Sequence, residues 1–236
     1  MKINGIIWDY DGTLADTRIK NLNVTKAIIS ELIAGINVKD TVLNSLKSYE
    51  QANLRSSNWR DLYRNEFNMR EKEIDQAGRL WTKYQSADNT EVKLFEGIDQ
   101  TVTKLGAFSQ GIVSQNSSKI IKQNLDEFNL GVYFSHIIGY EEVDLAKQKP
   151  HPDGLLSCIS KITNKKKDMS VLYIGDHITD IECVHNANKK IGEKTVFSVL
   201  LNHSNDNTWK EWNLEPDYIA NNPADIPDIV SIFMNA

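Results

Sequence analysis

Two aspartates separated by one residue follow the first apolar run of the chain. The run is Ile3 to Trp8, and Asp9, Asp11 and Gly12 come directly after it. Gly12 has no Cβ, so the chain can turn tightly there and a ligand can approach its backbone. Two neighbouring carboxylates at a strand end can attack a substrate, transfer a proton or hold a cation. Asp-x-Asp-Gly is also a common turn sequence, so the pair needs partners before it indicates a site.

A second acidic pair follows another apolar run, Ser170 to Ile174. Asp176 and Asp180 lie about one helical turn apart in the sequence. Thr179 and Glu182 have the spacing of a capping box, which predicts that a helix begins there. The N-terminus of such a helix carries partial positive charge and would face the same place as the two carboxylates.

Two segments between these pairs add a hydroxyl group, amides and a cation. Ser114 to Asn116 follow the apolar run Gly111 to Val113. They offer a hydroxyl and backbone amides at a predicted helix start, which suits phosphate oxygens. Lys149 supplies a cation a few residues before another predicted helix, with Pro152 expected at the first helical position.

Bringing these segments together requires strands that end on the same edge of one sheet. The apolar runs that precede them, with weaker runs at His136 to Ile138 and Thr195 to Leu201, alternate with helix-like stretches. Short continuous apolar runs suit strands buried on both faces, which is typical of a parallel sheet covered by helices. Ligands bind beyond the carboxyl ends of such strands. The predicted fold class is therefore α/β, with a doubly wound, Rossmann-like parallel sheet.

The alternation of strands and helices is interrupted after the first strand. Between residues 18 and 93 apolar side chains recur only at helical spacing, which predicts an inserted helical subdomain with its own apolar interior. The predicted domains are thus a sheet domain of residues 1–17 and 94–236 and a helical insertion of residues 18–93. The residues that carry the helical pattern are Val24, Ala27, Ile28, Leu32, Trp59, Leu62, Tyr63, Phe67, Leu80, Trp81 and Tyr84.

The excess of acidic side chains at the predicted strand ends indicates a bound cation. Asp9, Asp11, Asp176 and Asp180 would bring up to four negative charges together against one clear lysine. Like charges a few ångströms apart raise their pKa values or recruit a cation. Oxygen ligands without a cluster of cysteines or histidines select a hard ion, and Mg²⁺ is the common one with phosphate substrates. A carboxylate, Mg²⁺, a hydroxyl and a lysine round one point predict a phosphoryl-transfer site.

Composition excludes several classes of protein. The 236 residues include 27 basic and 32 acidic side chains, a net charge of −5, which gives no basic footprint for nucleic acid. No apolar run approaches the roughly 20 residues that span a bilayer, and the amino terminus shows no secretory signal. Cys158 and Cys183 show no metal-ligand spacing and are expected to be small apolar residues inside helices. Lys165 to Lys167 are expected to lie in a solvated loop.

The ordered motifs resemble those of a known family. They are DYDGT at 9–13, IVS at 112–114, KPHP at 149–152 and GDHITD at 175–180. In this order, each after its own strand, they resemble the haloacid dehalogenase superfamily of hydrolases. The insertion after the first motif resembles the helical cap of the phosphoglycolate phosphatase-like and β-phosphoglucomutase-like branch. The resemblance extends over nearly the whole chain.

The resemblance implies a role for each matching residue. Asp9 would be the nucleophile that forms an aspartyl-phosphate, and Asp11 would protonate the leaving oxygen and then activate water. Mg²⁺ would be held by the carboxylates of Asp9 and Asp176, with the backbone carbonyl of Asp11. Lys149 would stabilise the nucleophile and the charge that develops on the phosphoryl group.

Other positions of the motifs support these residues. Asp180 would orient Lys149 or a metal-bound water, and the structural alternative is an acid that favours the N-terminus of a helix. His177 stands where Ser is more frequent in the family, and a supporting or surface role is expected for it. Ser114 would bind a phosphoryl oxygen, while Asn116 stands one residue later than the Asn of many relatives. The predicted phosphate- and substrate-binding residues are Gly12, Thr13, Ser114, Gln115, Asn116 and Lys149.

Asp11 distinguishes between activities within the family. Dehalogenases do not place an acid there, because a departing halide needs no proton, whereas the alkoxide of a phosphate ester does. We therefore expect a cytoplasmic phosphatase, a monomer or homodimer, that acts on a small phosphorylated metabolite. A phosphomutase of the β-phosphoglucomutase type shares all four motifs and stays an alternative. A non-catalytic phosphate-binding or signalling protein is the alternative from another class.

The sequence leaves the identity of the substrate open. Phosphoglycolate, a nucleoside monophosphate, a sugar phosphate and pyrophosphate all fit the motifs. The segment Asn202 to Trp212 either borders the entrance of the site or packs on the edge of the sheet, and packing is the expectation. Candidate substrate contacts within the insertion are Arg18, Arg55, Arg60, Arg64 and Arg70.

Overall fold

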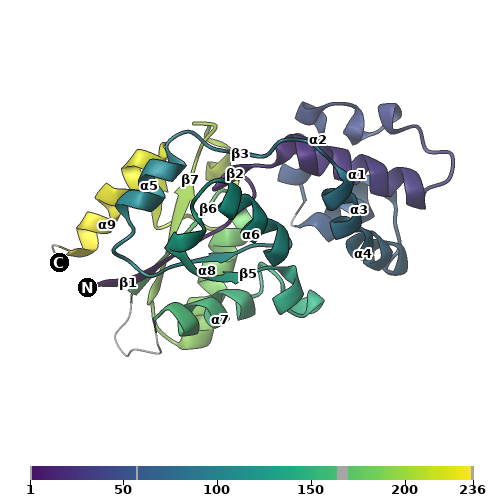
Figure 1. Ribbon diagram of the computed structural model, residues 1–236. Coiled ribbons are helices and arrows are strands. Elements are labelled where there is room, and N and C mark those ends of the chain that lie inside the picture. Colours follow the sequence, from purple (N-terminus) through teal and green to yellow (C-terminus); the bar gives the residue numbers. More distant parts are fainter. Residues whose placement is uncertain (1, 57, 164–169, 235–236) are drawn as a thin grey trace. The chain divides into compact units, whose positions relative to one another are not determined.

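The chain forms two compact units, each described here by itself. The computed structural model describes residues 2–56, 58–163 and 170–234, so the lysines at 165–167 lie outside the described residues. One unit comprises residues 1–15 and 94–236, and the other comprises residues 16–93. This division differs from the one expected from the sequence only at residues 16 and 17. Figure 1 shows the helices and strands of both units.

A six-stranded parallel sheet forms the centre of the first unit, as the α/β prediction requires. The strand order is β5-β4-β1-β6-β7-β8. Five of these strands lie where the apolar runs predicted them, and β8 was not predicted. The strands are β1 (Ile3–Trp8), β4 (Gln110–Val113), β5 (Phe134–Ile138), β6 (Ser170–Gly175), β7 (Val196–Leu201) and β8 (Tyr218–Ala220).

Strand β1 occupies the middle of the sheet, between β4 and β6. Its register places Trp8 opposite Ile112 of β4 and opposite Ile174 of β6. The buried Trp8 donates its indole N–H to Oε1 of Gln110 at 2.9 Å, and Nε2 of Gln110 donates to the carbonyl of Val102 at 3.1 Å. Burying these polar groups is tolerated because each has a partner. The three strands whose ends carry the acidic and hydroxyl motifs are therefore direct neighbours.

Helices cover both faces of the sheet. Because side chains alternate along a strand, Val196 and Phe197 of β7 point to opposite faces. Val196 belongs to the apolar cluster that includes residues of α7 and α8, whereas the ring of Phe197 contacts Phe233 of α9 with centroids 4.9 Å apart. Figure 1 shows α5 and α9 together on one side of the sheet. The helices are α5 (Ile98–Lys104), α6 (Ser118–Glu127), α7 (Asp153–Ile162), α8 (Ile178–Ile191) and α9 (Ile226–Met234).

Short helical turns complete the loops of this unit. Cys158 of α7 and Cys183 of α8 are free and fully buried in the apolar cluster, as their expected role as small apolar residues requires. The 3₁₀ turns are η3 (Gly131–Tyr133), η4 (Tyr140–Glu142), η5 (Leu145–Lys147), η6 (Thr208–Glu211) and η7 (Pro223–Asp225). Within the described ranges, no helix is both long and apolar enough to cross a membrane.

The second unit is helical and has its own apolar core. The three stretches with helical spacing are confirmed as helices, while α2 was not predicted. Buried side chains of all four helices pack into one cluster, as an inserted bundle requires. The two connecting segments pair as short strands, β2 (Ala15–Asp16) and β3 (Lys93–Leu94). The helices are α1 (Arg18–Leu32), α2 (Leu46–Leu54), α3 (Trp59–Phe67) and α4 (Glu71–Ala87), with turns η1 (Val38–Asp40) and η2 (Val42–Asn44).

Candidate active site

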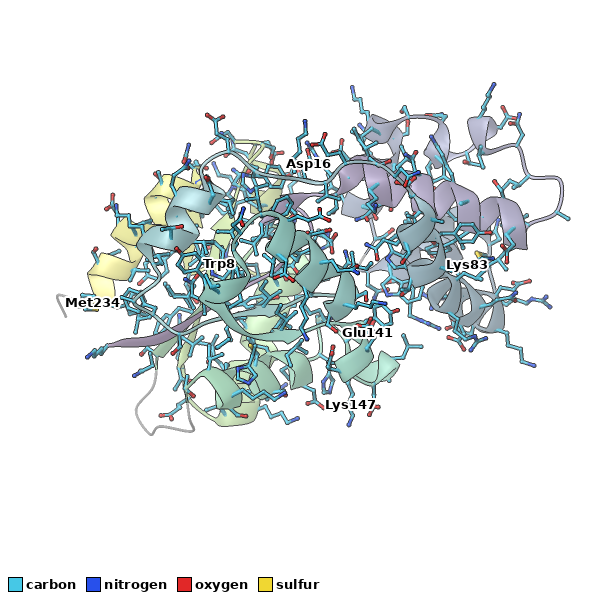
Figure 2. All side chains as sticks on the ribbon, in the orientation of Figure 1. Trp8, Asp16, Lys83, Glu141, Lys147 and Met234 are labelled. Atoms are coloured by element: carbon cyan, nitrogen blue, oxygen red, sulfur yellow. The ribbon has the colours of Figure 1, made fainter. Side chains whose placement is uncertain are left out.

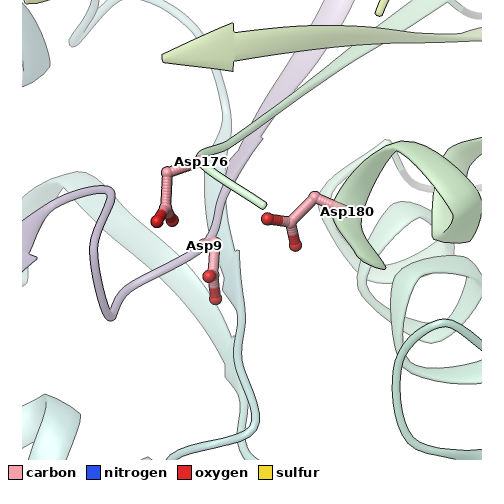
Figure 3. Close-up of side chains that lie close together, drawn as sticks. All are labelled: Asp9, Asp176 and Asp180. Carbon is pink, nitrogen blue, oxygen red and sulfur yellow. The ribbon is translucent and has the colours of Figure 1, made fainter. Parts of the chain in front are cut away.

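Three carboxyl groups lie together beyond the ends of β1 and β6. The backbone N–H of Asp9 donates to the carbonyl of Ile174 at 2.8 Å, so the chain leaves β1 alongside the end of β6. Oxygens of Asp9, Asp176 and Asp180 all lie within 4.8 Å of one another. Figure 3 shows the three side chains side by side. The sequence prediction that these acids meet at one edge of the sheet is therefore correct.

Lys149 lies between two of these carboxylates. Its Nζ is 2.8 Å from Oδ1 of Asp9 and 2.7 Å from Oδ1 of Asp180. Burial alone would lower the pKa of Lys149, but the charges of Asp180 and Asp9 outweigh it and raise the pKa well above its ordinary value. Lys149 is therefore charged at any physiological pH. Burial raises the pKa of Asp9, and the charges of Asp180 and Asp176 raise it further. The charge of Lys149 lowers it, but does not cancel the rise.

Asp180 is held from three sides. Its Oδ1 accepts from Lys149 and from the hydroxyl of Tyr173 at 3.1 Å, and its Oδ2 accepts from the backbone N–H of His177 at 3.2 Å. Helix α8 begins at Ile178 with His177 as its N-cap, so Asp180 closes the capping box. The predicted box of Thr179 and Glu182 was therefore wrong by two residues, because the carboxylate nearest the free N–H of residue 177 is Asp180. Both readings of Asp180 apply: it caps the helix and contacts Lys149.

Asp176 contacts the loop that follows β1. The hydroxyl of Thr13 donates to Oδ1 of Asp176 at 2.7 Å. Burial, followed by the charge of Asp180, raises the pKa of Asp176 to about 7. Gly12 has a φ of +81°, and a Cβ there would lie 2.3 Å from Oδ2 of Asp176. Gly12 is therefore required both by its backbone conformation and by the close approach of Asp176.

Asp11 points to a different neighbour, the loop after β4. Its Oδ1 accepts from Nδ2 of Asn116 at 2.9 Å, and its Oδ2 lies 3.4 Å from the hydroxyl of Ser114. Gln115 of the same loop donates its side-chain amide to the carbonyl of Lys149 at 3.1 Å. The loop thus contacts both Asp11 and the backbone of Lys149. Asp9 and Asp11 are two residues apart in the chain, yet their carboxylates lie in different electrostatic surroundings.

The start of α6 differs from the expectation that its amides would serve phosphate oxygens. The amide of Asn116 donates to Oγ of Ser114 at 3.1 Å, and the amide of Ser117 donates to Oδ1 of Asn116 at 2.7 Å. The amide of Ser118 donates to Oε2 of Glu141 at 2.9 Å. Glu141, labelled in Figure 2, therefore occupies the positive end of the helix. No sequence signal indicated it, because Glu141 reaches this place from η4, beyond β5.

His177 and the tryptophan segment also lie near the acids. Nδ1 of His177 is 3.1 Å from the hydroxyl of Thr179, and burial lowers the pKa of His177 below its ordinary value. The ring of Trp212 lies 6.5 Å from that of His177, centroid to centroid. This position beside the residue that follows Asp176 favours the alternative that the segment Asn202 to Trp212 borders the site.

The arginines of the helical unit are engaged within that unit. Arg60 pairs with Glu71 and Asp75 at 2.7 and 2.8 Å, and Arg55 pairs with Glu66 at 2.9 Å. All five candidate arginines have carboxylate partners there. Their partners lie on the helices, apart from Asp16 of β2, so the charge of each arginine also has a structural use. Pro152, expected as a first helical residue, is instead the N-cap of α7.

The donor set at the strand ends is suited to a divalent cation. Asp9, Asp176 and Asp180 offer carboxylate oxygens alone, and hard cations prefer oxygen ligands. Burial raises the pKa of both Asp9 and Asp176, and the neighbouring charge of Asp180 raises it further, so the charged forms of these acids lack compensation. A bound cation would offset that excess negative charge. The acidic cluster is therefore a candidate metal site.

A sequence model of the haloacid dehalogenase-like hydrolase family matches residues 6–192 of the chain. The chain belongs to the haloacid dehalogenase-like hydrolases. The match begins within β1 and includes all four motifs, so the resemblance seen in the sequence is confirmed. The chain is accordingly a hydrolase of this family.

Individual relatives are distant but cover most of the chain. It is 26% identical over 202 residues to a phosphoglycolate phosphatase of Salmonella typhi, covering 78% of each protein. It is 23% identical over 236 residues to the pyrophosphatase PpaX of Bacillus mycoides, covering 98% of each. A crystal structure from Lactobacillus plantarum has a TM-score of 0.77 at 16% identity, covering 97% of this chain and all of the other. This last likeness shows that the two chains share a fold over nearly their whole length.

Proposed function

We propose that this chain is a Mg²⁺-dependent phosphatase that hydrolyses a small phosphomonoester through an aspartyl-phosphate on Asp9. One observation carries the proposal: two carboxylates of one strand end have different surroundings. Asp9 lies between Lys149 and Asp176, and Asp11 lies against Ser114 and Asn116. The ion pair with Lys149 favours the charged form of Asp9 that a nucleophile needs, against the burial that raises its pKa. The contacts with Ser114 and Asn116 hold Asp11 in a separate place, from which it can transfer a proton.

The first step would transfer the phosphoryl group to Asp9. A carboxylate oxygen of Asp9 attacks phosphorus, the bond to the leaving oxygen breaks, and Asp11 gives its proton to that oxygen. Lys149 favours the charged form of Asp9 and orients it, and Ser114 turns its hydroxyl from Asp11 to a phosphoryl oxygen of the bound substrate. When bound, the metal supplies positive charge that offsets the charge of the phosphoryl oxygens.

The second step would return Asp9 to its starting state. Asp11 takes a proton from water as that water attacks phosphorus, and the bond from phosphorus to Asp9 breaks. Inorganic phosphate leaves, and Asp11 again carries the proton for the next cycle. The net reaction consumes one ester and one water and forms one alcohol and one phosphate.

The proposed metal ligands are the carboxylates of Asp9 and Asp176 and the backbone carbonyl of Asp11. The carboxylate of Asp180 lies close to those of Asp9 and Asp176, but three donors already contact its oxygens. We therefore assign Asp180 to orienting Lys149 rather than to binding the metal. The proposed substrate- and phosphate-binding residues are Gly12, Thr13, Ser114, Gln115, Asn116 and Lys149.

The substrate class is a small phosphorylated metabolite. The sheet unit supplies the chemistry in this proposal, and the helical unit, residues 16–93, is a cap that supplies specificity. The names of the relatives make phosphoglycolate and pyrophosphate the first two candidates. A phosphate-release screen with these two compounds, nucleoside monophosphates and sugar phosphates would identify the preferred substrate.

The test of the activity uses p-nitrophenyl phosphate. The wild-type protein should release phosphate with Mg²⁺ and lose this activity in EDTA, and Asp9→Asn should be inactive while folded. Lack of turnover by folded wild-type protein, or full activity of Asp9→Asn, would refute the proposal. Conversion of β-glucose 1-phosphate to the 6-phosphate without phosphate release would indicate a phosphomutase instead.

A further inference from the structure

Asn116 joins the loop after β4 to the carboxylate of Asp11. Its Nδ2 donates to Oδ1 of Asp11 at 2.9 Å, and its own backbone N–H donates to Oγ of Ser114 at 3.1 Å. Its carbonyl accepts from the backbone N–H of Tyr140 at 3.0 Å. Only 3% of Asn116 is exposed, so these contacts are made away from bulk water.

The orientation of the Asn116 amide follows from its second partner. The backbone N–H of Ser117 donates to Oδ1 of Asn116 at 2.7 Å. A backbone N–H can only donate, so the atom facing Ser117 must be the amide oxygen and the atom facing Asp11 must be the nitrogen. Asn116 is therefore a fixed donor to Asp11, held in place by the backbone that begins α6.

Ser114 supports the other oxygen of the same carboxylate. Its hydroxyl lies 3.4 Å from Oδ2 of Asp11. The oxygen of that hydroxyl also accepts from the backbone N–H of Asn116, which helps to position it. Two neighbouring residues of one loop thus contact both oxygens of Asp11. An acid that must deliver a proton to one atom of the substrate gains rate from such orientation.

We infer that Asn116 is a positioning residue that fixes the Asp11 carboxyl group for proton transfer to the leaving oxygen. This inference rests on the proposed function. Asp11 gives its proton to the leaving oxygen as the bond from phosphorus breaks, and later takes one from the attacking water. Asn116 neither gives nor takes a proton; its N–H holds Asp11 in place through both steps.

The basicity of the leaving group reports on this role. Phenoxide is a strong base and needs a proton as it leaves, whereas p-nitrophenoxide needs one much less. Phenyl phosphate and p-nitrophenyl phosphate otherwise present nearly the same molecule to the site. Loss of phosphate binding or of folding would slow both reactions alike, but loss of an oriented acid slows phenyl phosphate selectively.

The experiment compares kcat/KM of Asn116→Ala on these two substrates, because this ratio reports transfer of the phosphoryl group to Asp9 and not the second step, which both substrates share. We expect kcat/KM to fall about tenfold on phenyl phosphate and less than about threefold on p-nitrophenyl phosphate. Asn116→Leu, which has nearly the same size but no N–H to donate, should show the same selectivity. Asn124→Ala is the matched control, because Asn124 also lies on α6 and donates to the hydroxyl of Tyr10 at 2.7 Å. It should lower both rates equally or not at all.

Asp11→Asn separates this inference from the proposed function. If Asp11→Asn slows phenyl phosphate selectively and the Asn116 variants do not, the role of Asn116 is refuted and that of Asp11 stands. If Asp11→Asn shows no selectivity, Asp11 is not the acid and the proposed function fails with it. Equal losses on both substrates with a raised KM in the Asn116 variants would show that Asn116 acts in phosphate binding alone and would refute its role in positioning Asp11.

Discussion

The ammonium of Lys149 lies 2.7 Å from Oδ1 of Asp180, and the two side chains are only 6% and 1% exposed. The same ammonium contacts Asp9, so one cation links the acid at the end of β1 to the acid in the first turn of α8. Removing one member of a buried charged group leaves the others without compensation, which is costly. Lys149 therefore contributes both to the stability of the sheet unit and to the proposed reaction at Asp9.

Lys149→Met should therefore impair folding stability as well as activity. We expect the free energy of unfolding to fall by about 3 kcal/mol or more, because two buried carboxylates lose their counter-charge. Phosphatase activity should fall at least about a hundredfold. Urea denaturation and steady-state kinetics measure the two effects.

Lys147→Met is the matched control for that variant. Lys147 stands two residues earlier, is half exposed, and pairs with Asp144 and Asp153 at 3.5 Å. Figure 2 labels it. Exposed pairs of this kind contribute about 1 kcal/mol or less, so stability and activity should hardly change. Equal effects of the two substitutions would contradict the account of Lys149.

Stability of the metal-free protein should depend on pH through Asp176. The pKa of Asp176 is about 7 in the folded protein against an ordinary value of 3.8, so the folded state binds this proton more tightly than the unfolded chain does. The stabilisation is complete below the ordinary pKa and is lost as the pH rises through about 7. In EDTA, the melting temperature should therefore be lower at pH 8 than at pH 5.

Asp176→Asn and added Mg²⁺ identify the group responsible. The substitution removes the titrating carboxyl, so the variant should lose less stability than the wild type between pH 5 and pH 8. Mg²⁺ should raise the wild-type melting temperature at pH 8 and have little effect on the variant, because a ligand of the folded state stabilises it. A wild-type melting temperature that rises from pH 5 to pH 8 in EDTA would contradict the assignment.

Gly12→Ala should abolish activity with a loss of stability. The new methyl group would lie 2.3 Å from Oδ2 of Asp176, and the φ of +81° is strained for any residue with a Cβ. Gly192→Ala provides the control, since Gly192 has a φ of +91° and no atom near the position of its Cβ. Gly192→Ala should cost about 1 kcal/mol and keep full activity. Similar activity of the two variants would show that the approach of Asp176 to Gly12 is unimportant.

The sequence predicted the parts of the fold that depend on local pattern. Runs such as Ile3–Trp8 and Ser170–Gly175 consist mainly of apolar residues because both faces of the sheet are covered, and that pattern is visible in the sequence alone. Strand β8 was not predicted because three residues at the edge of a sheet show almost no pattern of apolar and polar side chains. The start of α8 was predicted two residues too late because Asp180 and Glu182 both have the spacing of a capping-box acid. Only the backbone conformation shows that the helix begins after His177.

The site was predicted from its motifs, whereas its supporting contacts were not. Four separate strand ends must converge in a parallel sheet, so their polar residues could be brought together without a structure. Tyr173 fits the apolar pattern of its strand, so nothing in the sequence indicates that its hydroxyl donates to Asp180. Glu141 reaches the start of α6 from beyond β5. Contacts of this kind depend on how loops meet in space, which no local pattern encodes.

Trapping the covalent intermediate tests the central claim most directly. Wild-type protein mixed with p-nitrophenyl phosphate and Mg²⁺ is quenched during turnover and treated with borohydride, which reduces an aspartyl-phosphate to homoserine. Mass spectrometry of the peptides then locates the reduced residue. The account predicts homoserine at position 9, dependent on substrate and absent from Asp9→Asn. Homoserine at position 11, or continued turnover with no reduced aspartate, would contradict it.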